Sequence, residues 1–151
     1  MTSLYIWLKF LHLAGLGLFL IGHGVSAGTS LMLRKASADA LRAALLRLSI
    51  QSYAATYPGL LLLLVTGVWM GFAGHWWRSG WIWTAIGVLV AVVVVMSALS
   101  VPYHKARDAA SGKPPGADME TALKPARPLE LAAVGSIGLL ILFFLMVFKP
   151  F

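Results

Sequence analysis

Four apolar stretches dominate this chain of 151 residues, and each has about the 20 residues that a helix needs to cross a bilayer. They cover residues 4–33, 54–73, 81–101 and 129–148. Inside lipid, every backbone polar group must be hydrogen-bonded within the protein, so such stretches fold as helices. The sequence therefore predicts an all-α polytopic membrane protein. We expect a single membrane domain over 1–151, a four-transmembrane-helix bundle that runs up-down-up-down.

The connections between these stretches differ in character. Residues 74–80 are short enough to predict an antiparallel hairpin of the second and third helices. Residues 102–128 are polar and contain a Pro-Pro-Gly sequence, which predicts an exposed loop. Residues 38–53 predict a helical extension that leads into 54–73 and bends near Pro58, because proline removes a backbone hydrogen bond.

The extension carries its own signals of a helix. Ser37 is placed to cap a helix that begins at Asp39. Leu41, Leu45 and Leu48 then fall on one stripe, which is the face that we expect to be buried.

Basic residues predict the orientation. The formal net charge is +7, from 12 Lys and Arg against 5 Asp and Glu. Nine of the 12 lie in the connections after the first and third helices, and the other three are Lys9, Arg78 and Lys149. The positive-inside rule then places both long connections in the cytoplasm and both termini outside a bacterial inner membrane. The charge is interpreted as a topology signal, and no nucleic-acid partner is expected.

Two histidines in the first helix are the clearest candidates for chemistry, because polar groups inside a membrane are expensive. His12 and His23 are 11 residues apart, which puts them about 20° apart in azimuth and about 16 Å apart in height. Neutral imidazole is a common axial ligand of haem iron. His104 ends the third helix near the level of His23, and His75 lies near the level of His12, so the candidate pairs are His23 with His104 and His12 with His75. The alternative is that His12 and His23 hydrogen-bond across the bundle, while His75 and His104 are ordinary interfacial residues.

Glycine and tryptophan form two further patterns. Gly24 and Gly28 make a GxxxG motif, which favours tight helix packing, either within the bundle or in a homo-oligomer. The tryptophans around 74–80 are typical of an aromatic belt at the membrane interface. The alternative is a docking surface for a quinone or porphyrin. These tryptophans are Trp69, Trp76, Trp77, Trp81 and Trp83.

Other classes of function find no support in the sequence. The chain has no cysteine, which excludes disulfides and thiolate sites. It has no G-x-S-x-G motif, no phosphate-binding glycine loop and no intramembrane carboxylate pair.

Several short motifs together resemble the HemJ-type protoporphyrinogen oxidases and the related CopD-like and uncharacterised predicted integral membrane proteins. The motifs are WLKFLH at 7–12, LLRL at 45–48 before Pro58, Gly67, Tyr103-His104, and Lys149-Pro150-Phe151. The resemblance implies a small inner-membrane bundle that binds haem b, and His12 matches the family's first-helix haem ligand. The family's lysine early in the third helix is missing from 81–85, and Pro128-Leu129-Glu130 replaces its Asn-Glu-x-Pro. Both departures weigh against protoporphyrinogen oxidation.

The leading hypothesis is a haem b protein that handles electrons within the membrane. His12 is the favoured iron ligand, followed by His23 and His104, and the expected partners are the lipid bilayer and a membrane redox partner. One alternative is a non-enzymatic accessory subunit of a larger membrane complex. A third is the handling of copper or a small solute, which the CopD-like resemblance suggests.

Overall fold

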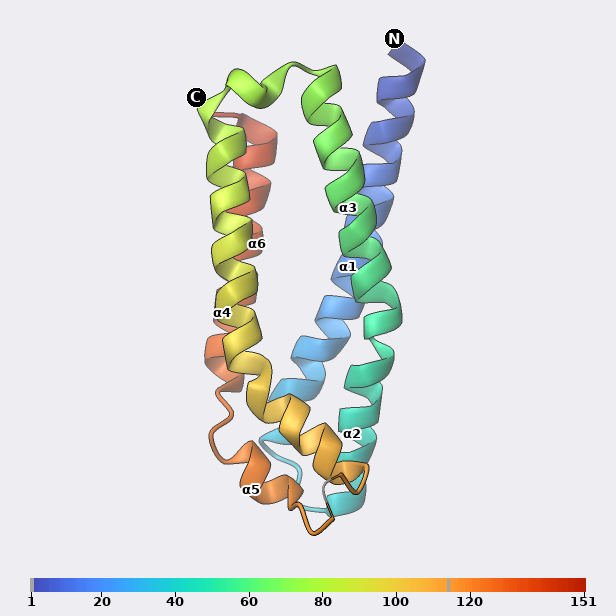
Figure 1. The fold of residues 1–151 in the computed structure, drawn as a ribbon, viewed down its shortest axis with the longest axis vertical. Coiled ribbons are helices and arrows are strands. Elements are labelled where there is room, and N and C mark those ends of the chain that lie inside the picture. Colours follow the sequence, from blue (N-terminus) through green and yellow to red (C-terminus); the bar gives the residue numbers. More distant parts are fainter. Residues whose placement is uncertain (1, 114) are drawn as a thin grey trace.

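Helices make up the regular secondary structure of the computed structural model, which describes residues 2–113 and 115–151 (Figure 1). In chain order they are α1 (Thr2–Leu33), α2 (Asp39–Gln51), α3 (Tyr53–Ala73), the 3-10 turn η1 (Trp76–Arg78), α4 (Gly80–Ala110), α5 (Met119–Leu123) and α6 (Pro128–Phe148). Four helical stretches are long and apolar enough to span a membrane: α1, α2 continued by α3, α4, and α6. The predicted all-α polytopic bundle is confirmed.

The long helices pack as two antiparallel pairs, α1 with α3 and α4 with α6 (Figure 1). α3 and α4 are consecutive and run in opposite directions, as the predicted hairpin requires. Within the described residues, however, their backbones make no close approach, so the two arms of this hairpin do not pack on each other. Each arm has a better partner, because glycines let the backbones within each pair come closer.

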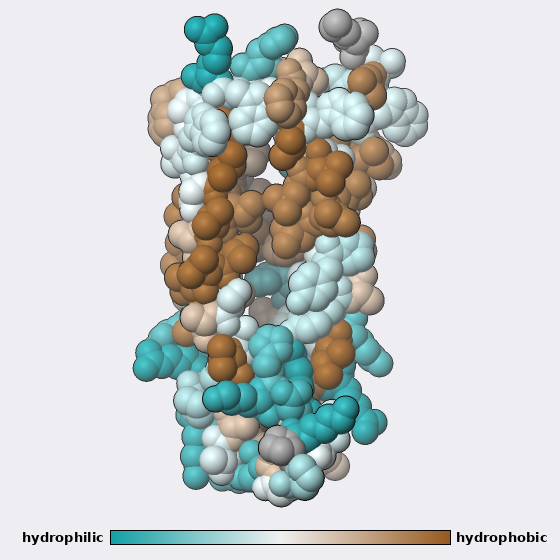
Figure 2. Space-filling model, viewed as in Figure 1, coloured by the Kyte–Doolittle hydropathy of each residue, from teal (hydrophilic) through white to brown (hydrophobic). Residues whose placement is uncertain are grey.

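The two ends of the bundle differ in composition. The N-terminus, the C-terminus and η1 lie together at one end, here called the terminal end (Figure 1). α5, the beginning of α2 and the end of α4 lie at the opposite end, here called the basic end. Figure 2 shows a largely apolar body towards the terminal end, polar surface at the basic end, and a hollow between the apolar columns of the two helix pairs.

α1 and α3 approach each other closely at three glycines, Gly15 and Gly22 of α1 and Gly59 of α3. A Cβ atom on Gly15 would lie 3.1 Å from the Gly59 carbonyl oxygen, and one on Gly22 would lie 2.7 Å from the Ser52 carbonyl oxygen. By contrast, a Cβ atom on Gly24 or Gly28 would meet nothing within 4 Å in the described part of the chain. The tight seam of α1 therefore uses Gly15 and Gly22, and the predicted GxxxG pair plays no part in the packing within this chain.

The bend before α3 lies at Ser52, six residues earlier than the predicted bend near Pro58, and Pro58 itself is inside α3. Two hydroxyl groups add hydrogen bonds to backbone carbonyl oxygens at this interruption. Ser52 Oγ donates to the Ser49 carbonyl oxygen at 2.8 Å, and Thr56 Oγ1 donates to the Ser52 carbonyl oxygen at 2.9 Å. These bonds let the chain turn from α2 into α3 while it stays in contact with α1.

α4 runs on to Ala110, nine residues past the predicted end at Val101, with Pro102 inside the helix. The predicted loop over 102–128 is therefore helical in its first part and contains α5 later, while Pro114 lies outside the described residues. The extension is stabilised by burial, because Tyr103, Ala106 and Arg107 pack into the basic end although the sequence around them is polar.

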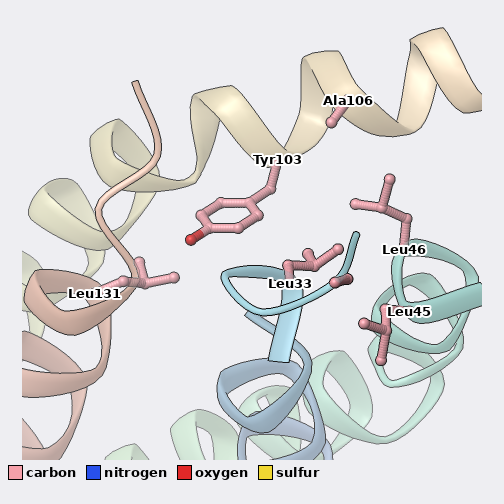
Figure 3. Packing of buried hydrophobic residues seen from close by; sticks show 7 residues of the cluster. Leu33, Leu45, Leu46, Tyr103, Ala106 and Leu131 are labelled. Atoms are coloured by element: carbon pink, nitrogen blue, oxygen red, sulfur yellow. The ribbon is translucent and has the colours of Figure 1, made fainter. Parts of the chain in front are cut away.

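A small hydrophobic core closes the basic end (Figure 3). Its buried members come from α1, the following turn, α2, α4 and α6: Leu33, Ala36, Leu45, Leu46, Tyr103, Ala106 and Leu131. Leu45 and Leu46 are buried, whereas Leu41 and Leu48 are exposed, so the predicted leucine stripe is wrong except at Leu45. The predicted Ser37 cap is also wrong, because Ala38 is the N-cap residue and no side chain caps the helix.

Some tryptophans of the terminal end pack against other side chains, while others are exposed, as expected of an interfacial belt. Trp81 is buried, while Trp69 and Trp83 are more than half exposed. The Trp76 ring packs on Trp81 and, edge to face, on Tyr5 of α1. The Lys149 ammonium lies 3.9 Å from the centre of the Trp76 ring. The Trp81 backbone N–H donates to the Phe151 oxygen at 3.1 Å. These contacts join the two helix pairs at the terminal end.

Candidate functional site

His12 is held between α1 and α3 by a hydrogen bond to Thr66. Its Nδ1 atom lies 3.0 Å from Thr66 Oγ1, and Thr66 Oγ1 lies 2.5 Å from the Leu62 carbonyl oxygen. Because a carbonyl oxygen only accepts, the Thr66 hydroxyl donates to Leu62 and accepts from Nδ1–H of His12. This arrangement selects the tautomer of His12 whose Nε2 carries a lone pair, which is the form of histidine that ligates a metal.

Gly67 of α3 lets the His12 ring lie close against that helix. A Cβ atom on Gly67 of α3 would lie 3.2 Å from His12 Cε1, so a larger residue there would press on the imidazole. The side chain of His12 is half-buried. The hydrogen bond across the bundle agrees with the alternative interpretation of His12, and it leaves Nε2 available for a ligand.

His23 lies nearer the basic end and faces the other helix pair. Its ring stacks on Phe19, with 5.5 Å between ring centres and 12° between planes. A Cβ atom on Gly135 of α6 would lie 2.9 Å from His23 Nε2 and 3.5 Å from Met96 Cε of α4. His23 and Met96 therefore converge on one glycine, where α1, α4 and α6 meet.

His12 and His23 lie about 20° apart around α1, but their neighbours differ. His23 meets Gly135 of α6, whereas His12 packs against Thr66 and Gly67 of α3. On α6, Met146 lies 11 residues after Gly135, so by helix periodicity it shares the flank of Gly135 and lies about 16 Å nearer the terminal end.

His104 belongs to a different cluster, centred on Arg107 of α4. The Nη1 atom of Arg107 lies 3.4 Å from His104 Nδ1 and donates to the Tyr53 hydroxyl. Its Nη2 atom donates to Ser49 Oγ at 2.6 Å, and the guanidinium lies 4.8 Å from the centre of the Tyr53 ring. Ser49 Oγ in turn lies 3.4 Å from Ser26 Oγ of α1. We call Arg107, Ser49, Tyr53 and His104 the Arg107 cluster, and with Ser26 it connects α1, α2, α3 and α4.

From the sequence, Arg107 was interpreted only as a charge that marks the topology. In the fold it is buried, with 8% of its surface exposed. Its place could have been found from the stripe that Tyr103, Ala106, Arg107 and Ala110 would form on a continued helix. Its partners Ser49 and Tyr53 lie more than 50 residues away in the chain, so no local pattern identifies them.

Neither predicted histidine pair is joined by a hydrogen bond in residues 2–113 and 115–151. His12 bonds to Thr66, His104 contacts Arg107, and His75 lies in the turn before η1 with φ of 54°. Over the same residues, no group of three or more His, Cys, Asp or Glu side chains is placed to hold a metal ion. The two histidines of α1 thus have different neighbours, α3 for His12 and Gly135 of α6 for His23.

Comparison with known proteins identifies the chain at the level of a family. Residues 6–150 match the family described as predicted integral membrane protein (DUF2269). No curated protein and no solved structure matches the chain. The match agrees with the uncharacterised membrane-protein part of the resemblance, while the kinship with HemJ-type and CopD-like proteins remains a prediction.

Proposed function

This chain belongs to the DUF2269 family of predicted integral membrane proteins, and we propose that its bundle binds haem b within the membrane, between the two helix pairs. The observation that carries the proposal is the hydrogen bond from His12 Nδ1 to Thr66, which leaves Nε2 as the free, metal-binding nitrogen. An axial histidine of haem usually has this kind of support from its second nitrogen. His12 would be the axial ligand, and the bound haem would supply one-electron chemistry.

The residues around His12 fit such a group in three respects. The imidazole is anchored through Nδ1, Gly67 lets the ring lie close against α3, and His12 shares a flank of α1 with His23, which meets the other helix pair. The α3 and α4 backbones also stay apart on this side of the molecule. Met146, on the flank of α6 that carries Gly135, would provide a thioether, and the combination of histidine and methionine raises the reduction potential of haem iron. His12 and Met146 are therefore the ligand pair that we propose.

The proposal is tested by the optical spectrum of the protein purified from haem-supplemented membranes. We expect a Soret band, and the His12→Ala variant should lose it. Met146→Leu should keep the haem but convert it from the low-spin to the high-spin form, because a bulky apolar residue replaces the sulfur ligand. Met32→Leu is the matched control, because Met32 is an exposed α1 residue beyond His23, far along the helix from His12.

Three results would decide against this reading. A protein without a Soret band, even after reconstitution with haem, would remove haem binding altogether. Loss of the band in His23→Ala but not in His12→Ala would move the site to Gly135, where His23 and Met96 converge. Copper without iron in a metal analysis would favour the copper-handling alternative, since imidazole and thioether also suit Cu(I).

The orientation that we propose places the basic end in the cytoplasm of a bacterial cell, because the two connections rich in Lys and Arg lie there. The chain has no cysteine, so an introduced cysteine is the single thiol of each variant. A Ser111→Cys variant carries a single thiol at the basic end, and Ser79→Cys carries one at the terminal end. In intact spheroplasts a membrane-impermeant maleimide should label Cys only in the Ser79→Cys variant, and the reverse result would invert the topology.

A further inference from the structure

Arg107 is a buried cation that has no anionic partner in the described part of the chain. The salt bridges among those residues are Arg42 with Asp39 and Glu120, and Arg127 with Glu130. Arg107 is instead bonded to neutral groups, the hydroxyls of Ser49 and Tyr53 and the His104 ring. The charge of Arg107 is therefore stabilised by two hydroxyl dipoles, the His104 ring and the face of the Tyr53 ring. No carboxylate of the described residues lies within 4.0 Å of its nitrogen atoms.

The guanidinium also has hydrogen-bonding capacity to spare. It carries five N–H donors, and three contacts to neighbouring side chains use part of them. The Nε atom is buried and makes no hydrogen bond in residues 2–113 and 115–151. A buried N–H of a charged group that lacks an acceptor is costly, and the penalty is larger where the charge itself is unpaired. An anion at this point would relieve both costs.

We propose that the Arg107 cluster binds a phosphate oxyanion, supplied by the headgroup of an anionic phospholipid in the leaflet at the basic end. The fork of an arginine matches two oxygens of a phosphate group. The hydroxyls of Ser49 and Tyr53 can rotate to donate to the same anion, because each hydroxyl is both donor and acceptor. Phosphate thus fits the donors of the cluster better than any group that must itself donate.

The position of the cluster agrees with a lipid source. Arg107 lies in the last turn of α4, at the polar limit of a span that begins at Gly80. Exposed Lys105 and Arg47 add positive charge on the neighbouring surface of α4 and α2, and such basic surface attracts anionic headgroups. The site is independent of haem, because it shares no residue with His12, Thr66 or Met146.

His104 is the exposed member of the Arg107 cluster, so we expect an anion to approach from its side. It is exposed, and its 3.4 Å contact with Arg107 Nη1 is the longest in the cluster. Ser49 is buried and Tyr53 is half-buried against the guanidinium. An incoming phosphate therefore displaces His104 by rotation of one surface side chain and takes over the Nη1 donor, while the packed partners stay in place.

The test uses the full chain in nanodiscs of phosphatidylcholine, with and without phosphatidylglycerol. Retained lipid is counted by native mass spectrometry and stability is measured by thermal unfolding. We expect phosphatidylglycerol to raise the apparent Tm of the wild type and to remain bound after release from the nanodisc. Arg107→Gln should weaken this binding by about tenfold or more, since a charge-assisted hydrogen bond is lost. Lys124→Gln is the matched control, because it removes one exposed charge at the basic end that the proposed site does not use.

Each outcome bears on the proposal. An unchanged Tm of the wild type on adding phosphatidylglycerol would overturn it and leave Arg107 as a structural link between helices. Equal losses in Arg107→Gln and Lys124→Gln would also overturn it, in favour of general surface attraction. Inorganic phosphate that reproduces the Tm shift in pure phosphatidylcholine would keep the phosphate site but assign it to a soluble anion. If Arg107→Gln does not fold, Arg107→Lys keeps the charge without the fork and should still bind the lipid several-fold more weakly.

Discussion

The Nδ1 atom of His12 and the Oγ1 atom of Thr66 lie 3.0 Å apart and join α1 to α3 inside the apolar body of the protein. Because the Thr66 hydroxyl is already committed to the Leu62 carbonyl oxygen, the bond sets the tautomer as well as the position of the imidazole. The Thr66 hydroxyl therefore leaves Nε2 as the nitrogen of His12 that can bind another group.

Thr66→Val should weaken haem binding without removing its ligand. Valine keeps the shape of threonine but cannot accept from Nδ1–H, so the imidazole loses both its anchor and its fixed tautomer. Loss of such a supporting partner lowers metal affinity by about 10–100-fold. Haem titration of the apoprotein, followed at the Soret band, measures this. Thr84→Val is the control, because Thr84 is exposed and bonds only to the Gly80 carbonyl oxygen of its own helix. Equal affinities for Thr66→Val and the wild type would mean that the hydrogen bond has no role in binding.

Two glycines of α1 that are two residues apart should respond oppositely to alanine. In Gly22→Ala the new methyl group would lie 2.6 Å from the Thr56 backbone nitrogen and would force α1 from α3. We expect a loss of about 1–3 kcal/mol in the free energy of unfolding. In Gly24→Ala the methyl group has open space, and the higher helix propensity of alanine adds up to ~1 kcal/mol. Unfolding in mixed micelles compares the two, and a Gly22→Ala protein as stable as Gly24→Ala would contradict the packing of this seam.

His75 should tolerate glycine and resist valine. Its φ of 54° is in the left-handed region, which costs an ordinary residue about 1–2 kcal/mol and a β-branched residue more. His75→Gly should therefore match or exceed the wild type in thermal stability, whereas His75→Val should unfold at a lower temperature. The same pair of variants tests the predicted partnership of His75 with His12. If His75 were a haem ligand, both variants would lose or alter the Soret band, and we expect neither to do so.

Acid should loosen α5 before the rest of the protein. Asp118 caps this short helix, accepting from the Thr121 hydroxyl and from the backbone N–H groups of Thr121 and Glu120. These bonds, the one from the Thr121 hydroxyl first, hold the pKa of Asp118 below its ordinary value of 3.8. The stabilisation is thus complete above that ordinary value and is lost as the pH falls through the lowered pKa in the folded protein. Amide hydrogen exchange at Thr121 should rise in that range. In Asp118→Ala it should already be fast at neutral pH, and equal protection in both proteins would contradict the cap.

The four apolar stretches predicted the architecture correctly, whereas the polar stretches led to wrong helix bounds. Four helices follow from apolar length alone, because lipid allows no other fold for such segments. The end of α4 was predicted nine residues early, because Pro102 and the charged residues after it are typical of a loop. Burial of Tyr103 and Ala106 against α2 and α6 overrides that local signal, and such contacts are not visible in one segment of sequence.

The candidate site, too, could be predicted only in part from the sequence. His12 and His23 could be found because an imidazole in an apolar helix is conspicuous, but their 11-residue spacing did not show that His12 packs against α3 and His23 against α6. Thr66 could not be assigned to His12, because nothing local distinguishes it from a threonine that bonds only to its own helix. Arg107 was overlooked because a basic residue next to a span normally marks topology. Only the fold shows that it lies inside the protein and is bonded to a serine and a tyrosine from two other helices.

The two helix pairs are joined at the terminal end through Trp76 and Trp81, at the basic end by Leu46 and Tyr103, and between these ends by His23 against Gly135, while α3 and α4 make no contact in the described residues. In a bilayer, packed side chains close such a frame at both ends and lipid tails lie along its sides. Under the proposed function, we therefore expect a molecule that binds at His12 to dissolve first in the membrane. Its supply would follow its partition into lipid, and the aqueous concentration on either side would matter only through that partition.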